Sequence, residues 1–267
     1  MDFINVYNKS IIGLPIEKLG SMMIGEESTI IKGMISPESK VWVNFFENHK
    51  FQLDKKGMEK IIKEFENIWS GIEPNLQKSL YAILFIIYEV LIKFYKYNND
   101  MSEEELSIRE SIRNKKYEEA CDNCLSLSEI EGLNIALCIE FSSVAHQLLT
   151  ILEKSNIIDY ESHIVNSFCS FGENITDKHS FLVLKNKQKP TVQYLVDIIN
   201  PLQVKKNETS EPKFGLAMYP ITEEDYQRIK EGKGITPKSI YEQDEMSIVD
   251  EKRLYGANMS VILNKNK

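Results

Sequence analysis

Three short runs of β-branched and aromatic residues follow one another in the second half of the chain, and they constrain its fold most strongly. The runs are HIVNSFCSF (163–171), HSFLVLK (179–185) and VQYLVDII (192–199), and polar turns separate them. Runs of this length and composition are typical of β-strands. Because short connections join antiparallel neighbours, the sequence predicts an antiparallel sheet here.

Helical patterns dominate the part of the chain before these strands. Apolar residues recur on one helical face in the segment 57–70, and Pro74 and Asn75 open a second helix that is apolar almost all round. The sequence predicts four helices before the strands, at about 57–70, 74–97, 103–127 and 134–154. Helices followed by antiparallel strands indicate the α+β fold class.

The polar stretch NNDMSEEE (98–105) is the best candidate for a boundary, because it interrupts the helical pattern. We therefore divide the chain into a mainly helical region, 1–100, and a second region, 101–267, which contains the predicted strands. The latter ends in a loop-rich extension, 202–267, for which we expect one short helix after Thr222 and a last strand with the sequence NMSVIL.

The balance of charge argues against a nucleic-acid surface. The 32 Lys and Arg residues are outnumbered by 40 Asp and Glu residues, which gives a net charge of −8. The basic clusters, Lys115-Lys116 and KNKQKP (185–190), are too short to follow a phosphate backbone. We expect no nucleic-acid partner.

We expect neither a signal peptide nor a membrane span. The first residues, MDFINVYNKS, lack a basic start and an apolar core. The apolar run 80–95 is shorter than the ~20 residues of a span and contains Glu89 and Lys93. Four cysteines in 267 residues are too few for a disulfide framework. The sequence predicts a protein that is cytoplasmic, or exported without a cleavable signal into a host cell.

Cys138 heads the apolar helical stretch CIEFSSVAHQLL, so it is either a small buried side chain or a reactive thiol. An ordinary thiol has a pKa near ~8.5 and supplies little thiolate at neutral pH, whereas a helix N-terminus and a nearby imidazolium favour the thiolate. A reactive cysteine therefore needs a histidine within hydrogen-bond reach and a third group that orients the imidazole ring.

His179 and Asp197 are the partners that the strand pattern provides. The loop KNKQKP is centred near Gln188, and a hairpin centred there pairs residues whose numbers sum to 376, as those of His179 and Asp197 do. Directly opposed residues point to the same face, with Cβ atoms ~4.5–5.5 Å apart. We predict that Asp197 binds one ring nitrogen of His179 and that the other ring nitrogen serves Cys138.

This order of residues resembles the transglutaminase-like superfamily of papain-type thiol enzymes. The matching segments are ALCIEFSSVAHQLL, HSFLVL and YLVDIINP, within residues 132–201. The resemblance implies a catalytic helix packed on an antiparallel sheet. It also implies that Cys138 attacks a carboxamide, that His179 transfers the proton and that Asp197 orients the ring. The superfamily includes bacterial effector enzymes that deamidate glutamines or cleave host proteins.

The sequence departs from that superfamily at two positions near the site. Ala136 stands where members often have glycine, two residues before the cysteine, and Phe181 stands where a tryptophan commonly follows the histidine. No tryptophan occurs after Trp69, so the indole that helps to form some members' oxyanion holes has no local counterpart. These departures favour hydrolysis or deamidation over protein cross-linking.

Several residues compete with this set. Asn200 is the alternative orienting group, and His163 is the alternative base. His146 lies eight helical residues from Cys138, about 12 Å along the axis, so we interpret it as a core or surface histidine. We interpret Cys169 as a buried thiol.

Three further features carry weaker signals. The spacing CDNC (121–124) fits a redox pair or half a zinc site, but the second half is missing, and we favour two cysteines on one helix face. Glu140 is expected to point away from Cys138, either solvated or paired with a loop. The amide of Cys138 is the expected oxyanion donor, with Asn134 a candidate for the second. We expect no cofactor and no metal.

The sequence thus leads to two functional hypotheses. The first is a thiol-dependent hydrolase or acyltransferase (deamidase, protease or transglutaminase) that acts through Cys138, His179 and Asp197. Its substrate is a protein, engaged at a glutamine side chain or a backbone amide. The alternative is a non-catalytic protein-binding module that retains a thiol-enzyme fold, with which the long helical first half and the missing indole are compatible.

Overall fold

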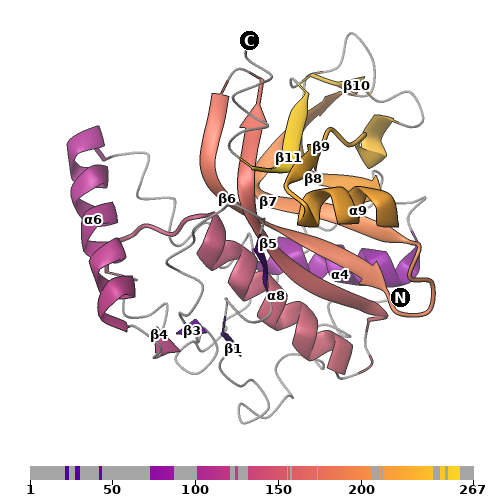
Figure 1. Cartoon of the computed structure of the whole chain (residues 1–267), viewed down its shortest axis with the longest axis horizontal. Helices are drawn as coiled ribbons and strands as arrows, with labels where there is room; N and C mark the ends of the chain where they lie inside the picture. Colours follow the sequence, from indigo (N-terminus) through magenta and orange to yellow (C-terminus); the bar gives the residue numbers. More distant parts are fainter. Residues whose placement is uncertain are drawn as a thin grey trace. The chain divides into compact units, whose positions relative to one another are not determined.

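The structure, a computed structural model, describes residues 22–23, 28–30, 42–43, 73–86, 101–120, 124–125, 132–154, 156, 158–172, 174–205, 211, 213–242, 247–249 and 252–258. These residues fall into two compact units, one drawn from 1–26 and 38–161 and the other from 27–37 and 162–267. The division at residues 161 and 162 differs from the boundary expected near residue 100. Helices and a mainly antiparallel sheet make up the described part, which confirms the α+β class (Figure 1).

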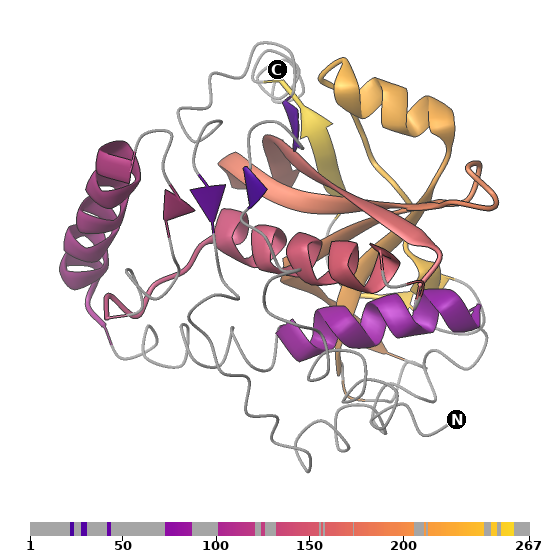
Figure 2. The ribbon, with the colours of Figure 1, turned by 90° about the horizontal axis from the view of Figure 1, so that it is seen from below.

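The first unit combines helices with a small sheet. Its helices are α4 (Pro74–Ile86), α6 (Glu103–Ala120) and α8 (Cys138–Lys154). The sheet has the order β1-β3-β4, with strands at Met22–Met23, Trp42–Val43 and Cys124–Leu125. Strand β3 pairs antiparallel with β1 and parallel with β4. Figure 2 shows α4 running alongside α8.

A side-chain cap opens α4. The Glu73 carboxylate accepts hydrogen bonds from the backbone amides of Asn75 and Leu76, each at 3.0 Å. These amides belong to the first turn, where no intrahelical acceptor exists. The remainder of the expected helix 74–97, beyond residue 86, lies outside the described residues, as does the whole helix expected at 57–70.

Helix α6 begins where the sequence predicts and ends earlier. The Ser102 hydroxyl accepts a hydrogen bond from the Glu105 amide at 3.2 Å and caps the first turn. The helix ends at Ala120 rather than near residue 127, because the chain then enters β4 and pairs with β3. Cys124 starts that strand, so its assignment to a helix face is wrong, whereas Cys121 lies outside the described residues.

Helix α8 confirms the expectation of a helix headed by Cys138, although the helix begins at that residue rather than near residue 134. The backbone carbonyl of Leu137 accepts a hydrogen bond from the Phe141 amide at 3.3 Å, so Cys138 is the first residue inside the helix. Phe141, Ala145 and Leu149 are buried at a spacing of four residues. This spacing is that of one helical face, and it gives α8 its apolar side.

One sheet dominates the second unit. Its hydrogen-bonded order is β10-β7-β6-β5-β11-β9, with β8 beside β7 and β2 beside β5. The pairs of defined register are antiparallel, except that β2 is parallel to β5. The strands are β2 (Ser28–Ile30), β5 (Tyr160–Phe171), β6 (Asn174–Asn186), β7 (Gln193–Lys205), β8 (Lys213–Ile221), β9 (Lys233–Ile235), β10 (Ser247–Ile248) and β11 (Arg253–Ala257).

The three strands that the sequence predicts are confirmed, but the prediction that residues 202–267 are rich in loops is wrong. Strand β7 continues to Lys205, and within the described residues four more strands and a short 3-10 helix (Ile240–Glu242) follow it. The sequence does not reveal β8, because residues 215–219 are buried in an unbroken run that lacks the alternation of a half-buried strand. The predicted last strand lies outside the described residues, apart from Asn258, which is in no strand.

The short helix expected after Thr222 is confirmed as α9 (Glu223–Lys230). Thr222 and Asp225 form a capping box: the Asp225 amide donates to the Thr222 hydroxyl at 3.1 Å, and the Thr222 amide donates to the Asp225 carboxylate at 2.9 Å. Three acidic residues occupy the first turn, where they complement the helix dipole.

The register of the β6–β7 hairpin is two positions away from the predicted one. Leu182 pairs with Val196, so paired numbers sum to 378 rather than 376. Asn186 explains the difference. Its side-chain oxygen accepts the amides of Gln188 and Lys189, both at 2.9 Å, and its own amide donates to the Val192 carbonyl at 3.0 Å. The loop is therefore closed between residues 186 and 192.

A bulge interrupts β7 just after Asp197. Asp197 pairs with Ala217 of β8, and the next defined pair joins Leu202 to Gly215. Four residues of β7, 198–201, thus lie opposite one residue of β8. A bulge is one of the few places where a strand accepts proline, and Pro201 lies within it.

We predict that Asn186 contributes measurably to the stability of the second unit. Asn186→Ala removes the acceptor of two loop amides and should lower the free energy of unfolding by about 1–2 kcal/mol. Urea denaturation measures this change. Lys189→Ala is the matched control, because the Lys189 side chain is exposed and only its backbone takes part in the turn. Equal losses in the two variants would contradict the role given to the Asn186 side chain.

Candidate functional site

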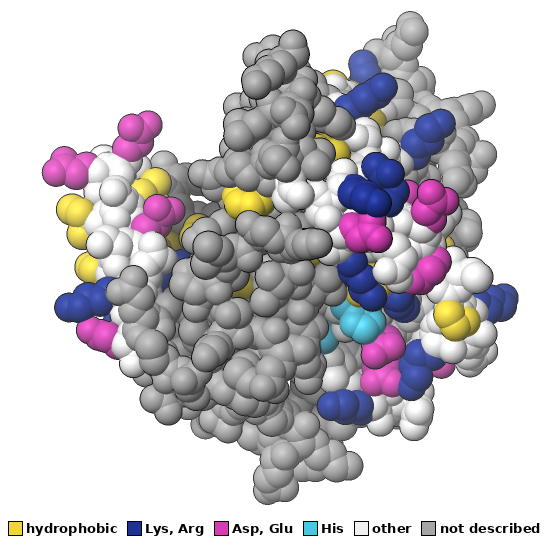
Figure 3. Space-filling view, in the orientation of Figure 1, with side chains coloured by type: hydrophobic (Ala, Val, Ile, Leu, Met, Phe, Trp, Pro, Cys, Tyr) yellow, Lys and Arg dark blue, Asp and Glu magenta, His cyan; other side chains and the backbone are white. Residues whose placement is uncertain are grey.

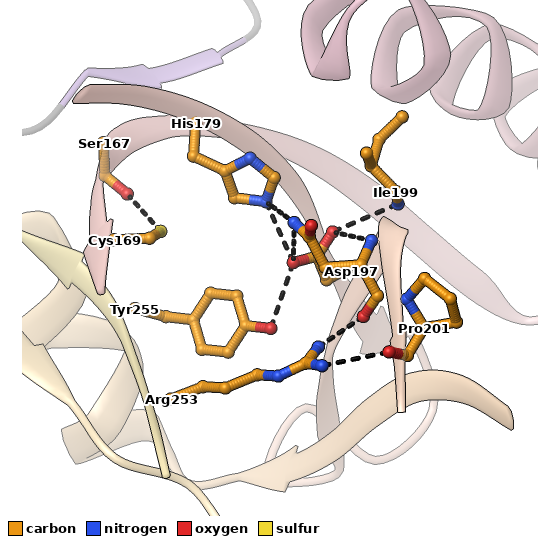
Figure 4. A network of polar contacts seen from close by, with 9 residues as sticks. Ser167, Cys169, His179, Asp197, Ile199, Pro201, Arg253 and Tyr255 are labelled. Atoms are coloured by element: carbon orange, nitrogen blue, oxygen red, sulfur yellow. Dashed lines mark hydrogen bonds and ion pairs between the residues drawn. The ribbon is translucent and has the colours of Figure 1, made fainter. Parts of the chain in front are cut away.

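The second unit contains a buried histidine–carboxylate pair. Nε2 of His179, on β6, lies 2.9 Å from Oδ2 of Asp197, on β7 (Figure 4). The side chains are 3% and 0% exposed, respectively. The predicted contact between these two residues is therefore confirmed.

The two residues are diagonal rather than direct neighbours. Continued by one residue beyond the Leu182–Val196 pair, the observed register places Phe181 opposite Asp197, and His179 lies two positions further along β6. A shift of two residues keeps a side chain on the same face of a strand, and diagonal neighbours remain within reach of long side chains. The prediction that His179 and Asp197 are directly opposed is thus wrong, although the predicted contact between their side chains exists.

Asp197 accepts hydrogen bonds from five donors. Besides His179, its Oδ2 accepts from Nδ2 of Asn200 at 3.1 Å and from the Tyr255 hydroxyl at 3.0 Å. Its Oδ1 accepts from the backbone amides of Ile199 at 3.2 Å and Asn200 at 3.3 Å. Figure 4 shows these groups converging on the carboxylate from three strands.

These donors keep the carboxylate ionised in spite of its burial. Burial acts to raise the pKa of Asp197, but the charge of His179 and hydrogen bonds from His179, Asn200 and Tyr255 lower it below its usual range. Burial, followed by the negative charge of Asp197, raises the pKa of Tyr255 well above its usual value, so this hydroxyl stays a donor.

The ionised carboxylate fixes the tautomer of His179. A carboxylate without a proton only accepts hydrogen bonds, so Nε2 of His179 must carry the hydrogen. In the neutral ring Nδ1 is then the basic nitrogen, and it lies on the other side of the ring from Asp197. Asn200 Nδ2 also lies 3.4 Å from Nε2, but both atoms carry hydrogens, so Asn200 supports the carboxylate rather than replacing it.

Aromatic rings surround the imidazole of His179. Phe171 meets it edge-on, with ring centroids 5.7 Å apart, and Phe181 lies roughly parallel to it at 6.3 Å. Tyr255 is inclined to it at 6.5 Å. These contacts restrict rotation of the ring and exclude water from one side of the pair, which strengthens its electrostatic interactions.

Arg253, two residues before Tyr255 on β11, holds the bulge of β7. Its Nη1 donates to the backbone carbonyl of Asn200, and its Nη2 donates to that of Pro201 at 2.9 Å. The guanidinium carbon lies 5.3 Å from the centroid of Phe171. Sequence reasoning identified neither Arg253 nor Tyr255, because they follow Asp197 by more than fifty residues and belong to no recognisable motif.

In the first unit, Cys138 is partly exposed at the first position of α8. Two arginines of α6 hold the segment that leads to it. Arg109 donates from Nη1 to the Leu133 carbonyl at 2.6 Å. Arg113 forms a buried ion pair with Glu140, with 2.5 Å between Nε and Oε1. The start of α8 is therefore fixed by side chains of α6.

The sequence leaves two alternatives for Glu140, solvated or paired with a loop, and its burial excludes the first. Its side chain is 0% exposed, and its Oε2 accepts the Leu137 amide at 2.9 Å. Glu140 is the third residue of α8, and this bond back to the residue before the helix is one half of a capping box. The expected pairing with a loop is confirmed, and the partner Arg113 is the part that the sequence did not reveal.

The remaining candidates lie elsewhere. Cys169 of β5 is fully buried, and burial raises the pKa of its thiol to about 11, so it stays protonated at neutral pH. His146 is buried within α8, as expected of a core histidine. The ring of His163 lies 6.4 Å from that of Tyr226 on α9. His49 lies outside the described residues.

Cys138 belongs to the first unit, whereas His179 and Asp197 belong to the second. The structure thus brings two of the three predicted residues together, and the contact of Cys138 with His179 stays a prediction. The role of Asn134 as an oxyanion donor is also untested. Its backbone adopts a left-handed conformation, with φ of 53°, in the turn before α8.

Acidic and basic side chains are interspersed over the described part of the face in Figure 3. The second unit contains ion pairs of this kind, in which Lys185 lies 3.5 Å from Glu223 and Lys233 lies 2.5 Å from Glu231. Within the described ranges, no helix is long and apolar enough to cross a bilayer, and no group of three or more His, Cys, Asp or Glu is arranged to hold a metal ion.

Comparison with known proteins finds no matching family model, curated protein or solved structure.

We predict that the Arg113–Glu140 pair stabilises the first unit as a coupled pair. Glu140→Gln or Arg113→Met alone leaves one buried charge without its counter-charge, which typically costs ~3–5 kcal/mol of unfolding free energy. The double variant should lose less than the sum of the two single losses. Urea denaturation of the four proteins measures the coupling, and additive losses would contradict it.

We also predict a pH-dependent contribution of Asp197 to stability. Because the pKa of Asp197 is lowered in the folded protein, its stabilising effect is complete above the unfolded value of ~3.9 and is lost as the pH falls through the folded value. The difference in unfolding free energy between wild type and Asp197→Asn should thus shrink as the pH falls below about 4. Glu224→Gln, at an exposed carboxylate, is the control.

Proposed function

We propose that the chain is a thiol-dependent hydrolase or acyltransferase that acts on an amide of a protein substrate. In this proposal Cys138 is the nucleophile, His179 the base and Asp197 the group that orients the imidazole. The observation that carries the proposal is the buried His179–Asp197 pair, in which an ionised carboxylate fixes the tautomer of the ring. The resemblance of three segments to the transglutaminase-like superfamily supports the same assignment.

The chemistry follows from the tautomer. Nδ1 of His179 takes the proton of the Cys138 thiol, and the sulfur attacks the carbonyl carbon of the substrate. The C–N bond breaks, the imidazolium gives its proton to the leaving nitrogen, and a thioester forms. Water then attacks the thioester with His179 as base, and the proton returns to the departing sulfur. The net change converts an amide and water into a carboxylic acid and ammonia or an amine.

Asp197 does not take the proton in this scheme. Its carboxylate stays ionised, holds the Nε2–H and stabilises the imidazolium that forms between the two proton transfers. The position of Cys138 at the start of a helix suits its role, because the first backbone amides and the dipole of α8 favour negative charge at this point.

The burial of His179, which is 3% exposed, favours a second candidate function. A base that acts on a substrate must be reached by it, whereas a buried pair in a binding protein needs no access. The second candidate is therefore a non-catalytic protein-binding module in which the pair has a purely structural role.

Alkylation of the thiols discriminates between the two candidates. We expect iodoacetamide to label Cys138 at about pH 6, in a manner lost in His179→Ala, because an ordinary thiol with a pKa near ~8.5 reacts slowly there. Cys169 is the internal control and should stay unlabelled until the protein unfolds. Equal, slow labelling of Cys138 in wild type and His179→Ala would refute the proposed base and favour the binding module.

Activity is measured by mass spectrometry of candidate protein substrates after incubation. An exchange of NH₂ for OH on glutamine marks deamidation, loss of ammonia with joined chains marks cross-linking, and fragments mark proteolysis. Cys138→Ala should abolish the change without altering the melting temperature. Asp197→Asn should lower the rate by roughly 10²–10⁴-fold, as the loss of an orienting carboxylate does, with the fold intact at neutral pH. Asn200→Ala should cost far less.

A further inference from the structure

The bulge of β7 leaves backbone carbonyls that need a partner. Between Asp197 and Leu202, four residues of β7 lie opposite a single residue of β8, so the regular ladder of hydrogen bonds is interrupted. Backbone carbonyls that lose their ladder partners are normally satisfied by another donor. Arg253 supplies one N–H donor to the carbonyl of Asn200 and another to the carbonyl of Pro201.

Arginine suits this task better than lysine does. The guanidinium is planar and presents two parallel N–H groups, which match two neighbouring acceptors, whereas an ammonium is a compact point charge. Arg253 uses Nη1 for the first carbonyl and Nη2 for the second. Its guanidinium also lies 5.3 Å from the ring of Phe171, which in turn meets the His179 ring edge-on.

Arg253 reaches the bulge across two intervening strands. Strand β11 is separated from β7 by β5 and β6, which in a flat sheet would place the two strands about 14 Å apart, at ~4.8 Å per interval. The side chains of Arg253 and Tyr255 nevertheless contact Asn200, Pro201 and Asp197, so the sheet is curled at this point (Figure 4). These contacts from β11 tie the two strands together.

The shape of the bulge determines how Asp197 is held. Asn200 donates to the Asp197 carboxylate twice, from Nδ2 at 3.1 Å and from its backbone amide at 3.3 Å. Both bonds require residues 198–201 to turn back toward Asp197. One of the two carbonyls that Arg253 binds is that of Asn200. Arg253 therefore acts on the same residue that supplies two of the five hydrogen-bond donors to Asp197.

We propose that Arg253 is a positioning residue of the His179–Asp197 pair, which acts through Asn200 by holding the β7 bulge in place. The catalytic part of this inference rests on the proposed function, but its geometric part does not. Without Arg253 the bulge relaxes and Asn200 leaves the carboxylate. The Asp197 side chain, no longer anchored by Asn200, turns away from Nε2 of His179, and the hydrogen bond that fixes the Nε2–H tautomer is lost.

The tautomer of His179 provides a readout that needs no substrate. The chain has four histidines, so ¹⁵N labelling of histidine gives few ring signals, and that of His179 is assigned by its loss in His179→Gln. In wild type we expect a single Nε2–H tautomer above the titration of the ring. In Arg253→Met and Arg253→Lys we expect a mixture of both tautomers, because neither side chain bridges the two carbonyls.

A matched control separates this effect from the loss of any arginine. Arg228 of α9 also donates to a backbone carbonyl, that of Gly234, at 3.2 Å, and this contact lies outside the β7 bulge. Arg228→Met should leave the tautomer as in wild type. Far-UV circular dichroism checks that each variant is folded. If Arg253→Met does not fold, Arg253→Lys decides the question by the same spectrum.

The role of Asn200 is tested by a double-variant cycle. The alkylation rate of Cys138 at about pH 6 should fall by about tenfold in Arg253→Met and by a similar factor in Asn200→Ala, which is the scale of one lost hydrogen-bonded contact. The variant carrying both changes should be no slower than Asn200→Ala alone, because the two residues act in series.

The outcomes distinguish this inference from the proposed function. A tautomer mixture in the Arg253 variants, with Cys138 unreactive in every protein, supports the positioning role and refutes the thiol enzyme. A single Nε2–H tautomer in both Arg253 variants overturns the positioning role, even where labelling of Cys138 depends on His179. Multiplicative losses in the double variant overturn the route through Asn200.

Discussion

A buried carboxylate needs hydrogen bonds, and the second unit is arranged to provide them to Asp197. An ionised group without donors is expelled from a protein interior or loses its charge, so five donors within hydrogen-bond distance are a strong constraint. The donors come from β6, from the bulge of β7 and from β11. Their convergence fixes the register of the hairpin, the shape of the bulge and the approach of β11 together, so that no one of these features can change alone.

The first unit applies the same principle at the start of α8. Glu140 is buried with a nearby backbone amide, that of Leu137, and a cation, Arg113, as its partners. Asp197 likewise binds amides that follow it by two and three residues. In both cases a carboxylate fixes the local backbone beside a residue with potential chemistry, Cys138 in one unit and His179 in the other. Buried charges of this kind define one conformation at the expense of stability that apolar side chains would supply.

The sequence predicted those parts of the fold that depend on local patterns. The helix α8 headed by Cys138, the short helix α9 after Thr222 and the strands β5, β6 and β7 each follow from the periodicity or composition of a single segment. The contacts of Arg253 and Tyr255 do not, because they depend on the curl of the sheet, which sums small twists over several strands. Strand β8 was hidden for a different reason, since burial on both faces removes the alternation that marks a strand.

The hairpin shows why an inexact register still led to the correct pair of side chains. Asn186 shifts the loop by accepting two amides, which moves every pairing by two positions from the predicted register. A shift of one position would have put Asp197 on the opposite face of the sheet from His179, whereas a shift of two preserves the face. Aspartate and histidine side chains then span the remaining diagonal, and the bulge after Asp197 adds Asn200 to the same face. For a polar pair on neighbouring strands, the parity of the register therefore matters more than its exact value.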